Sequence, residues 1–115
     1  MSAQTLQSMV SWVNDNALEN PTLADISNRL GYSPYYCSTQ FKGYVGITIK
    51  KYIARAKLEA AAKLLRDTDT RVVDIALHCG YSCHEALTRA FLAEYGCSPT
   101  ECRKRNREET ACHGR

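Results

Sequence analysis

Apolar residues recur along this chain at intervals of three and four, which is the spacing of one face of an α-helix. No stretch shows the apolar–polar alternation of a half-buried strand. The spacing over residues 5–18 predicts an amphipathic first helix. Residues 48–66 hold neither Gly nor Pro and are rich in Ala, Leu, Lys and Arg, so they predict one long helix with Thr48 as its N-cap. We expect an all-α fold of about seven helices.

The segments before and after the long helix resemble each other. Shared residues recur at an offset of 49 and then at an offset of 50, which places one inserted residue in a turn of the second copy. The pairs are Asp25-Ile26 with Asp74-Ile75, Gly31-Tyr32-Ser33 with Gly80-Tyr81-Ser82, Phe41 with Phe91, and Gly46 with Gly96. Each copy indicates a short helix, a tight turn and a second helix, which is a helix-turn-helix. The predicted organisation is a first subdomain over 5–47, a linker helix over 48–66, a second subdomain over 67–107 and a polar tail over 108–115.

Capping signals mark where the short helices begin and end. Residues 22–25 resemble a capping box, Gly31 suits a left-handed helix end, and Ser33-Pro34 suits an N-cap followed by the first helical position. Cys37 and Phe41 follow Ser33 at steps of four, so we expect both to face the core. In the second copy we expect the polar segment 67–70 to cap the helix after it. The helix of the second copy that follows the Gly-Tyr-Ser turn is expected to begin near Ser82 or Cys83. A last helix is predicted from Ser98, with a fraying tail from Arg103.

Positive charge is concentrated in the long helix. The formal net charge is only +3, yet residues 49–66 carry six Lys or Arg against the single Glu59, a net +5. A basic bridge between two helix-turn-helix units suits a polyanion that lies across both. A solvated lysine-rich face is the alternative. Because no apolar run has membrane length and no signal peptide opens the sequence, we expect a cytoplasmic protein with no membrane partner.

Six cysteines invite a metal or redox interpretation. His78-Cys79 and Cys83-His84 flank the second turn, and Cys97 and Cys102 flank the next one, but none of the spacings is the C-x2-C of common zinc sites. Buried thiols in a reducing compartment are the ordinary explanation. No nucleophile–base arrangement and no glycine-rich phosphate loop is present, so we expect no enzyme, no cofactor and no bound metal.

The second half of the sequence carries a specific signature. Its residues are Ile75-Ala76, Gly80-Tyr81, Leu87, Arg89, Phe91, Gly96, Ser98-Pro99 and Arg103. The first half of the same pattern is matched by Gly31-Tyr32-Ser33, Phe41-Lys42 and Tyr52-Ile53. In these positions the chain resembles the AraC/XylS family of transcription regulators, and its short length resembles the stand-alone MarA/SoxS-type activators.

The resemblance implies a monomer that binds double-stranded DNA, with one recognition helix in each of two successive major-groove segments, and that recruits RNA polymerase. Short polar or basic side chains on an exposed helix face can contact base edges, while helix N-termini and Lys or Arg contact phosphates. The residues expected to contact bases are Tyr35, Ser38 and Thr39 in the first unit and His84, Glu85, Thr88 and Arg89 in the second. Those expected to contact phosphates are Ser33, Lys42, Lys50, Lys51, Lys57 and Ser82. Arg89 could bond guanine O6 and N7, or it could contact only phosphate. Glu85 could accept from a cytosine amino group, or it could pair with Arg89 one turn away.

The chain departs from the family pattern where DNA would be contacted. MarA-type proteins have Trp, Gln and Arg at the positions of Tyr35, Ser38 and Thr39, so the first unit lacks long side chains that form two hydrogen bonds to one base. Cys83 replaces an N-cap Ser, and Ser82 is an alternative cap if the helix starts one residue earlier. Two other functions stay open: a DNA-binding fragment of a larger ligand-sensing regulator, and a cysteine-based metal- or redox-responsive helical module.

Overall fold

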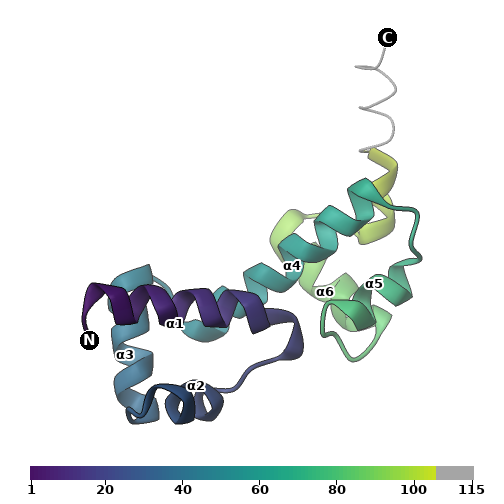
Figure 1. The fold of residues 1–115 in the computed structure, drawn as a ribbon. Helices are drawn as coiled ribbons and strands as arrows, with labels where there is room; N and C mark the ends of the chain where they lie inside the picture. Colours follow the sequence, from purple (N-terminus) through teal and green to yellow (C-terminus); the bar gives the residue numbers. More distant parts are fainter. Residues whose placement is uncertain (106–115) are drawn as a thin grey trace. The chain divides into compact units, whose positions relative to one another are not determined.

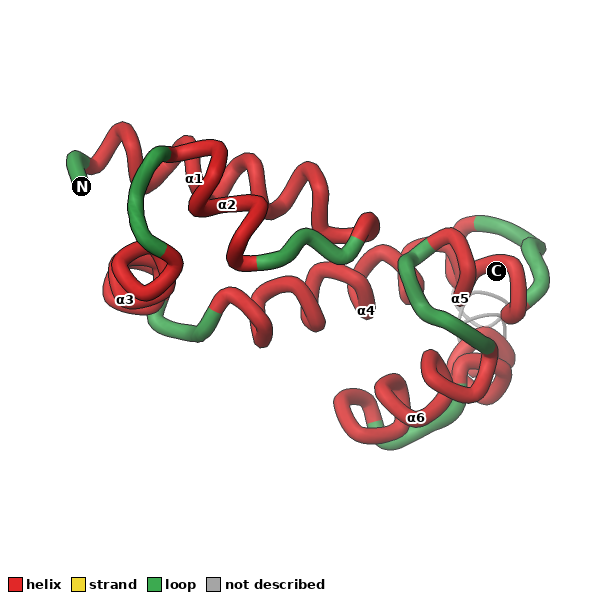
Figure 2. Tube along the Cα trace, turned by 90° about the horizontal axis from the view of Figure 1, so that it is seen from below, coloured by secondary structure: helices red, strands yellow, loops and turns green. Residues whose placement is uncertain are grey.

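The computed structural model describes residues 1–105, which fold into helices joined by short loops, without a strand in that range (Figures 1 and 2). The all-α prediction is therefore confirmed. The elements are α1 (Ala3–Asn16), the 3-10 turn η1 (Ala17–Glu19), α2 (Leu23–Leu30), α3 (Pro34–Val45), α4 (Ile49–Asp67), α5 (Val72–His78) and α6 (His84–Tyr95). Residues 99–105 are helical as well. The predicted tail over 108–115 and the end of the predicted second subdomain lie outside the described residues.

The chain forms two compact units that meet within the long helix α4. The first unit comprises Met1–Lys57 and the second begins at Leu58. Each unit contains a pair of short helices joined by a tight turn: α2 and α3 in the first, α5 and α6 in the second. The sequence-based boundaries, which set residues 48–66 apart as a linker, remain a prediction.

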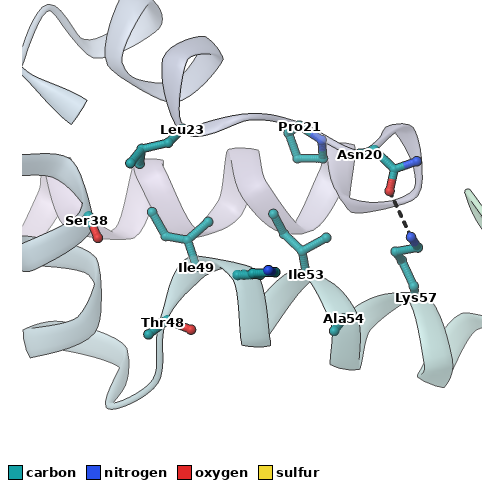
Figure 3. A pocket seen from close by; sticks show the side chains of 10 residues that line it. Asn20, Pro21, Leu23, Ser38, Thr48, Ile49, Ile53, Ala54 and Lys57 are labelled. Atoms are coloured by element: carbon teal, nitrogen blue, oxygen red, sulfur yellow. Dashed lines mark hydrogen bonds between the residues drawn. The ribbon is translucent and has the colours of Figure 1, made fainter. Parts of the chain in front are cut away.

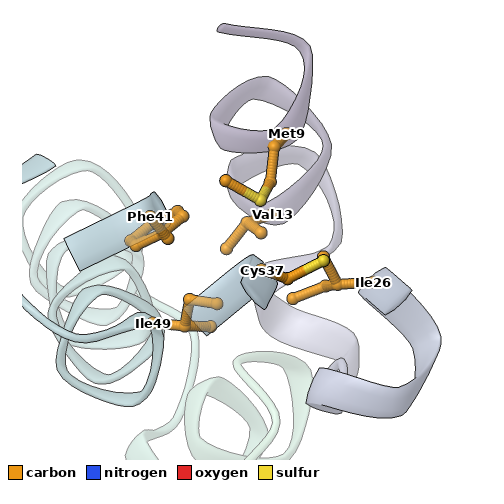
Figure 4. Packing of buried hydrophobic residues seen from close by; sticks show 6 residues of the cluster. All are labelled: Met9, Val13, Ile26, Cys37, Phe41 and Ile49. Atoms are coloured by element: carbon orange, nitrogen blue, oxygen red, sulfur yellow. The ribbon is translucent and has the colours of Figure 1, made fainter. Parts of the chain in front are cut away.

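The core of the first unit is built around Phe41, whose side chain is completely buried. Figure 4 shows it beside Met9 and Val13 of α1 and Ile49 of α4, with Ile26 of α2 next to Cys37 in the same cluster. The ring of Tyr52 meets that of Phe41 edge to face, with 5.4 Å between the ring centroids. Cys37, one helical turn before Phe41, is also fully buried. The prediction that these two α3 residues face the core is confirmed.

Local hydrogen bonds fix the turn of the first unit. Thr22 and Asp25 form the predicted capping box, with Thr22 Oγ1 accepting from the Asp25 amide at 3.1 Å and Asp25 Oδ2 accepting from the Thr22 amide at 2.9 Å. These bonds hold the pKa of Asp25 below its ordinary value. Gly31 ends α2 with a φ of 78°, as predicted, and Ser33 Oγ caps α3 by accepting from the Tyr36 amide at 3.2 Å. The start and the end of this turn are both set by short-range chemistry.

The second unit repeats this arrangement with one extra residue. Its turn glycine, Gly80, has a φ of 87° and lies 49 positions after Gly31. Helices α3 and α6 each have twelve residues and begin 50 positions apart, which confirms the inserted residue in the second turn. Leu87 and Phe91 of α6 are fully buried, in the positions of Cys37 and Phe41.

The polar segment 67–70 does not cap α5, contrary to the sequence-based expectation. Arg71 is the N-cap of α5 and makes no side-chain cap, although its Nε lies 3.1 Å from Asp74 Oδ2. Thr68 instead donates its hydroxyl to the Leu64 carbonyl at 2.6 Å, and it accepts from the Thr70 amide at 3.3 Å. A hydroxyl one turn after a helical carbonyl can satisfy that carbonyl, so Thr68 serves the end of α4 rather than the start of α5.

A fraying tail was expected from Arg103, but residues 103–105 are helical, and the rest of the expected tail lies outside the described residues. The last helix begins after Ser98, whose Oγ accepts from the Glu101 amide at 3.2 Å, and it continues through residue 105. Arg103 Nε donates to the Leu65 carbonyl at 3.1 Å and Nη2 donates to the Thr68 carbonyl at 3.2 Å. A guanidinium has several donors in a rigid fork, so one side chain satisfies carbonyls at and just beyond the end of α4. The last helix is thereby tied to the second unit.

We predict that replacing a turn glycine destabilises the protein and that replacing a helical glycine stabilises it. Gly31→Val and Gly80→Val should each lower the free energy of unfolding by about 1–3 kcal/mol, because a β-branched residue is strained at positive φ. Gly43 lies inside α3 without positive φ, and a Cβ there meets nothing within 4 Å. Gly43→Ala should therefore raise the stability by roughly 0.5–1 kcal/mol. Urea titrations followed by circular dichroism measure all three, and equal shifts of one sign would contradict the turn assignment.

Candidate nucleic-acid interface

Helix α3 presents a polar face on the side opposite Cys37 and Phe41. Tyr35 is 81% exposed, and Thr39 and Lys42 are exposed as well. The Thr39 hydroxyl donates to the Tyr35 carbonyl at 2.9 Å, which leaves its oxygen as an acceptor toward solvent. The sequence-based stripe of α3 is therefore an accessible surface in the structure.

Ser38 belongs to the same stripe but is only half-exposed. It lines a groove of about 500 Å³ in the first unit, which we call the Lys57 groove (Figure 3). This groove lies between the loop at Pro21 and the first turns of α4, and Ile49 and Ile53 form part of its apolar wall. Ser38 is thus less open to a large ligand than Tyr35 and Thr39 are.

The lysines of the first unit differ in their surroundings. Lys57 Nζ donates to Asn20 Oδ1 at 2.8 Å at one end of the Lys57 groove (Figure 3). Lys42, Lys50 and Lys51 are exposed, and Lys50 also lines that groove. The Lys57 ammonium therefore has a side-chain acceptor within the first unit, whereas the side chains of the other three lysines are exposed to solvent.

Helix α6 presents the longer polar side chains. His84, Glu85 and Arg89 are exposed on the face opposite Leu87 and Phe91. Thr88, the α6 counterpart of Ser38, is half-exposed and donates its hydroxyl to the His84 carbonyl at 3.0 Å. The predicted polar stripe is again on the surface.

The Glu85–Arg89 pair expected from the i, i+4 spacing is not formed. The ion pairs among residues 1–105 are Arg66 with Asp67 and Arg71 with Asp74. A long exposed side chain gains little from one surface ion pair, so solvation of both groups competes well with it. The Arg89 guanidinium is consequently available to an external acceptor.

The N-termini of the two recognition helices are capped differently. Ser33 caps α3 through its hydroxyl, whereas Cys83 is the N-cap of α6 and makes no side-chain cap hydrogen bond. The suggestion that Ser82 starts this helix one residue earlier is wrong, because α6 begins at His84. A thiol is a weak acceptor, so the first amides of α6 remain available to an anion.

Three exposed tyrosines near the turn of the first unit extend the surface beyond the predicted residues. The rings of Tyr32 and Tyr36 lie 5.2 Å apart between centroids, on either side of the α3 N-cap, and Tyr35 lies between them in sequence. Sequence reasoning selected only Tyr35. The signal that could have found the others is the density of aromatic residues just where a helix begins.

Net charge separates the two units. The first carries six Lys and Arg against three Asp and Glu, a net +3, and the second carries nine against nine. The uncompensated positive charge of the chain therefore lies in the first unit.

The turn of the second unit contains Tyr81, which is partly buried. Its pKa is raised to about 12 by burial and by the negative charges that Cys79 and Tyr95 can carry.

The cysteines do not gather into a metal site within residues 1–105. No group of three or more His, Cys, Asp or Glu side chains in that range is arranged to hold a metal ion. Cys37, Cys79 and Cys97 are buried and Cys83 is exposed. Burial raises the pKa of the Cys37 thiol. The alternative function as a cysteine-based metal module is not favoured by this arrangement.

Across the described part of the chain, every helix is too short or too polar to span a bilayer.

Comparison with known proteins gives a consistent result. A family model for a helix-turn-helix domain matches residues 26–105. The multiple antibiotic resistance protein MarA of Escherichia coli is 30% identical over 105 residues, covering 90% of this chain and 82% of MarA. The HTH-type transcriptional activator AarP of Providencia stuartii is 30% identical over 95 residues, covering 83% of this chain and 70% of AarP.

Coverage of other relatives is smaller. YkgA of E. coli is 33% identical over 102 residues, yet the chain spans only 42% of its length. Among solved structures, the DNA-binding domain of AdpA, crystallised with a target DNA, superposes with a TM-score of 0.84 over 90% of this chain and 94% of that one. At 23% sequence identity, this superposition shows that the two proteins share a fold.

The fold, the polar recognition-helix faces and these matches define a DNA-binding transcription regulator of the helix-turn-helix class. Within that class, the chain belongs to the AraC/XylS family, as its signature residues indicated.

We predict that Cys83→Ser stabilises the second unit. A serine hydroxyl at this N-cap can accept from an amide of the first turn of α6, which should add roughly 0.5–1 kcal/mol to the free energy of unfolding. Ser33→Ala is the matched control, because it removes the hydroxyl cap of α3 and should cost about 1 kcal/mol. Thermal melts under reducing conditions measure both, and a Cys83→Ser protein that melts lower would contradict the cap assignment.

Proposed function

We propose that the chain binds an asymmetric DNA site by placing α3 and α6 in two adjacent major-groove segments. The observation that carries this proposal is the pair of twelve-residue helices, each behind a tight glycine turn and each with a polar face exposed opposite its buried aromatic ring. A major groove admits one α-helix, and side chains on its outer face reach the base edges. The base contacts fall on Tyr35, Ser38 and Thr39 in α3 and on His84, Glu85, Thr88 and Arg89 in α6.

The two units have different tasks in this proposal. The first unit holds most of the uncompensated positive charge, but the side chains it offers to bases are short or aromatic. It therefore binds chiefly to phosphates, through Lys42, Lys50 and Lys51. Lys57 adds another phosphate contact when its ammonium exchanges the hydrogen bond to Asn20 for one to a phosphate oxygen. The second unit is neutral overall, and it carries Arg89, which can bond O6 and N7 of one guanine together. Backbone amides near Ser33 and Ser82 supply further phosphate contacts.

We further infer that the protein acts as a monomer on DNA, in the bacterial cytoplasm, and activates transcription by recruiting RNA polymerase. One chain already contains two unlike recognition helices, so an asymmetric site needs no second copy. Activation rests on the relative AarP, which is named a transcriptional activator. Transcription in vitro with purified RNA polymerase and a promoter that carries the selected site tests this, and repression or no effect would refute it.

Selection of bound sequences from random double-stranded DNA is the direct test of the main proposal. The enriched sequences should contain two short conserved blocks about one helical turn apart. A single block, or no enrichment over the starting pool, would contradict insertion of both helices.

We predict that DNA binding weakens steeply as salt concentration rises, and that the lysines of the first unit cause much of this effect. The logarithm of the association constant should fall linearly with the logarithm of salt concentration, as phosphate-bound cations are released. Lys51→Ala should weaken binding to all sequences alike and reduce this slope by about 1. Fluorescence anisotropy from low to high salt measures the slope, and a flat dependence for the unmodified protein would exclude the nucleic-acid function.

We predict that sequence preference depends most on Arg89. Arg89→Ala should lose about 1–3 kcal/mol of binding free energy on the selected site and relax preference at one or two base pairs. Ser38→Ala is the control on α3, where a half-exposed hydroxyl should matter less. Binding to a panel of single-base variants measures both. If Arg89→Ala weakened every sequence equally, Arg89 would be a phosphate ligand instead.

A further inference from the structure

Cys97 and Cys102 occupy two related positions at the start of the last helix. Ser98 is the N-cap of this helix, since its Oγ accepts from the Glu101 amide at 3.2 Å and its carbonyl accepts from the Cys102 amide at 2.9 Å. Cys97 is therefore the residue before the cap and Cys102 is the fourth helical residue. Side chains at these positions pack against each other in the hydrophobic staple of many helices. Here both staple residues are thiols.

The two thiols line one groove of about 610 Å³ in the second unit, which we call the Cys102 groove. Cys97 is only 4% exposed, whereas Cys102 is partly exposed. Tyr95 lines the same groove, and its pKa is raised by burial and by the negative charges of Glu59, Glu94 and the Cys102 thiolate. Because Cys102 is the more exposed of the two thiols, a reagent from solvent reaches Cys102 before it reaches Cys97.

The Cys102 groove has a positive rim. Lys63, Arg66 and Arg105 line it, and Glu59 is the acid among the lining residues. Arg66 is engaged with Asp67 at 3.2 Å, while Lys63 and Arg105 form no ion pair with another described residue. Cations beside a thiol favour the reactive thiolate, and they also raise the local concentration of anions.

We propose that Cys102 is a modification site for small anionic disulfides, of which oxidised glutathione is an example, and that Cys97 resolves the product. The Cys102 thiolate attacks one sulfur of the disulfide, which forms a mixed disulfide and releases one thiolate. Cys97 then loses its proton to solvent, and its sulfur attacks the Cys102 sulfur. The Cys97–Cys102 disulfide forms and the second small thiolate leaves. Two protein thiols are oxidised, and the external disulfide is reduced to two thiols.

The other cysteines within residues 1–105 do not share these features. Cys37 and Cys79 are fully buried. Cys83 is exposed but does not line the Cys102 groove. Cys112 lies outside the described residues. The protein for the test therefore carries Cys83→Ser and Cys112→Ser, and it is otherwise the full chain.

The first experiment identifies the product. This protein is incubated under native conditions with oxidised glutathione, and the reaction is followed by intact mass and by peptide mapping without reductant. We expect loss of two thiols and a peptide cross-linked through Cys97 and Cys102. With Cys97→Ser added, the reaction should stop at a glutathionyl group on Cys102. Reaction at Cys37 or Cys79, no reaction at Cys102, or a mixed disulfide that persists in the presence of Cys97 would each overturn the proposal.

The second experiment tests the positive rim. Bis(2-hydroxyethyl) disulfide, which is neutral, serves as the matched reagent for anionic oxidised glutathione. Lys63→Gln should slow the reaction with oxidised glutathione several-fold and leave the reaction with the neutral disulfide much less changed. Arg55→Gln removes the same charge in the first unit, outside this groove, and should slow neither reaction. Equal effects of Lys63→Gln on both reagents would refute recognition of the anion. Circular dichroism of each variant shows that the fold is retained, and DNA binding is not needed for any of these readouts.

Discussion

The complete burial of one phenylalanine in each unit is the constraint on which the rest of the structure depends. Helices α3 and α6 have twelve residues each, which is marginal for an isolated helix in water. Packing of Phe41 and Phe91 into the two cores supplies the missing stability. It also fixes the rotation of each helix about its axis, so the opposite face must be the one exposed. The stripe that we propose to face DNA is thus set by a buried ring on the opposite side of the helix.

The two units solve the same packing problem with different local chemistry. In the first, hydroxyls cap both α2 and α3; in the second, the equivalent caps are Arg71 and Cys83, and neither makes a side-chain cap bond. The second unit instead gains tertiary hydrogen bonds, chiefly those of Arg103 to carbonyls at the end of α4. A unit held by distant contacts can leave a helix N-terminus uncapped, and an uncapped N-terminus suits an anion such as phosphate.

Short-range signals explain how much could be predicted from the sequence. The repeat with its one-residue insertion, the capping box at Thr22, the left-handed Gly31 and the buried Phe41 all follow from spacing and residue type, and the structure confirms them. The errors have different causes. Thr68 bonds to the Leu64 carbonyl four positions back, which is a local alternative to capping the next helix. Arg103 lies 35 positions or more from its two acceptors, so no local pattern reveals those partners. Likewise, the groove that Ser38 lines is shared with the loop at Pro21 and with α4, which lie elsewhere in the sequence. The assignment of individual base and phosphate contacts stays a prediction.

Helix α3 lacks long side chains that form two hydrogen bonds to one base, and this affects how the two units share DNA recognition. Tyr35 offers a ring and one hydroxyl, and Thr39 offers a methyl and one hydroxyl already bonded to the Tyr35 carbonyl. Neither side chain can make two parallel bonds to one base, which is the geometry that separates guanine from the other bases most strongly. Arg89 in α6 has that geometry and no competing ion pair within residues 1–105. The net charge of +3 lies entirely in the unit with the weaker readers. Affinity that depends on phosphates and specificity that depends on bases are therefore expected to reside in different halves of the chain.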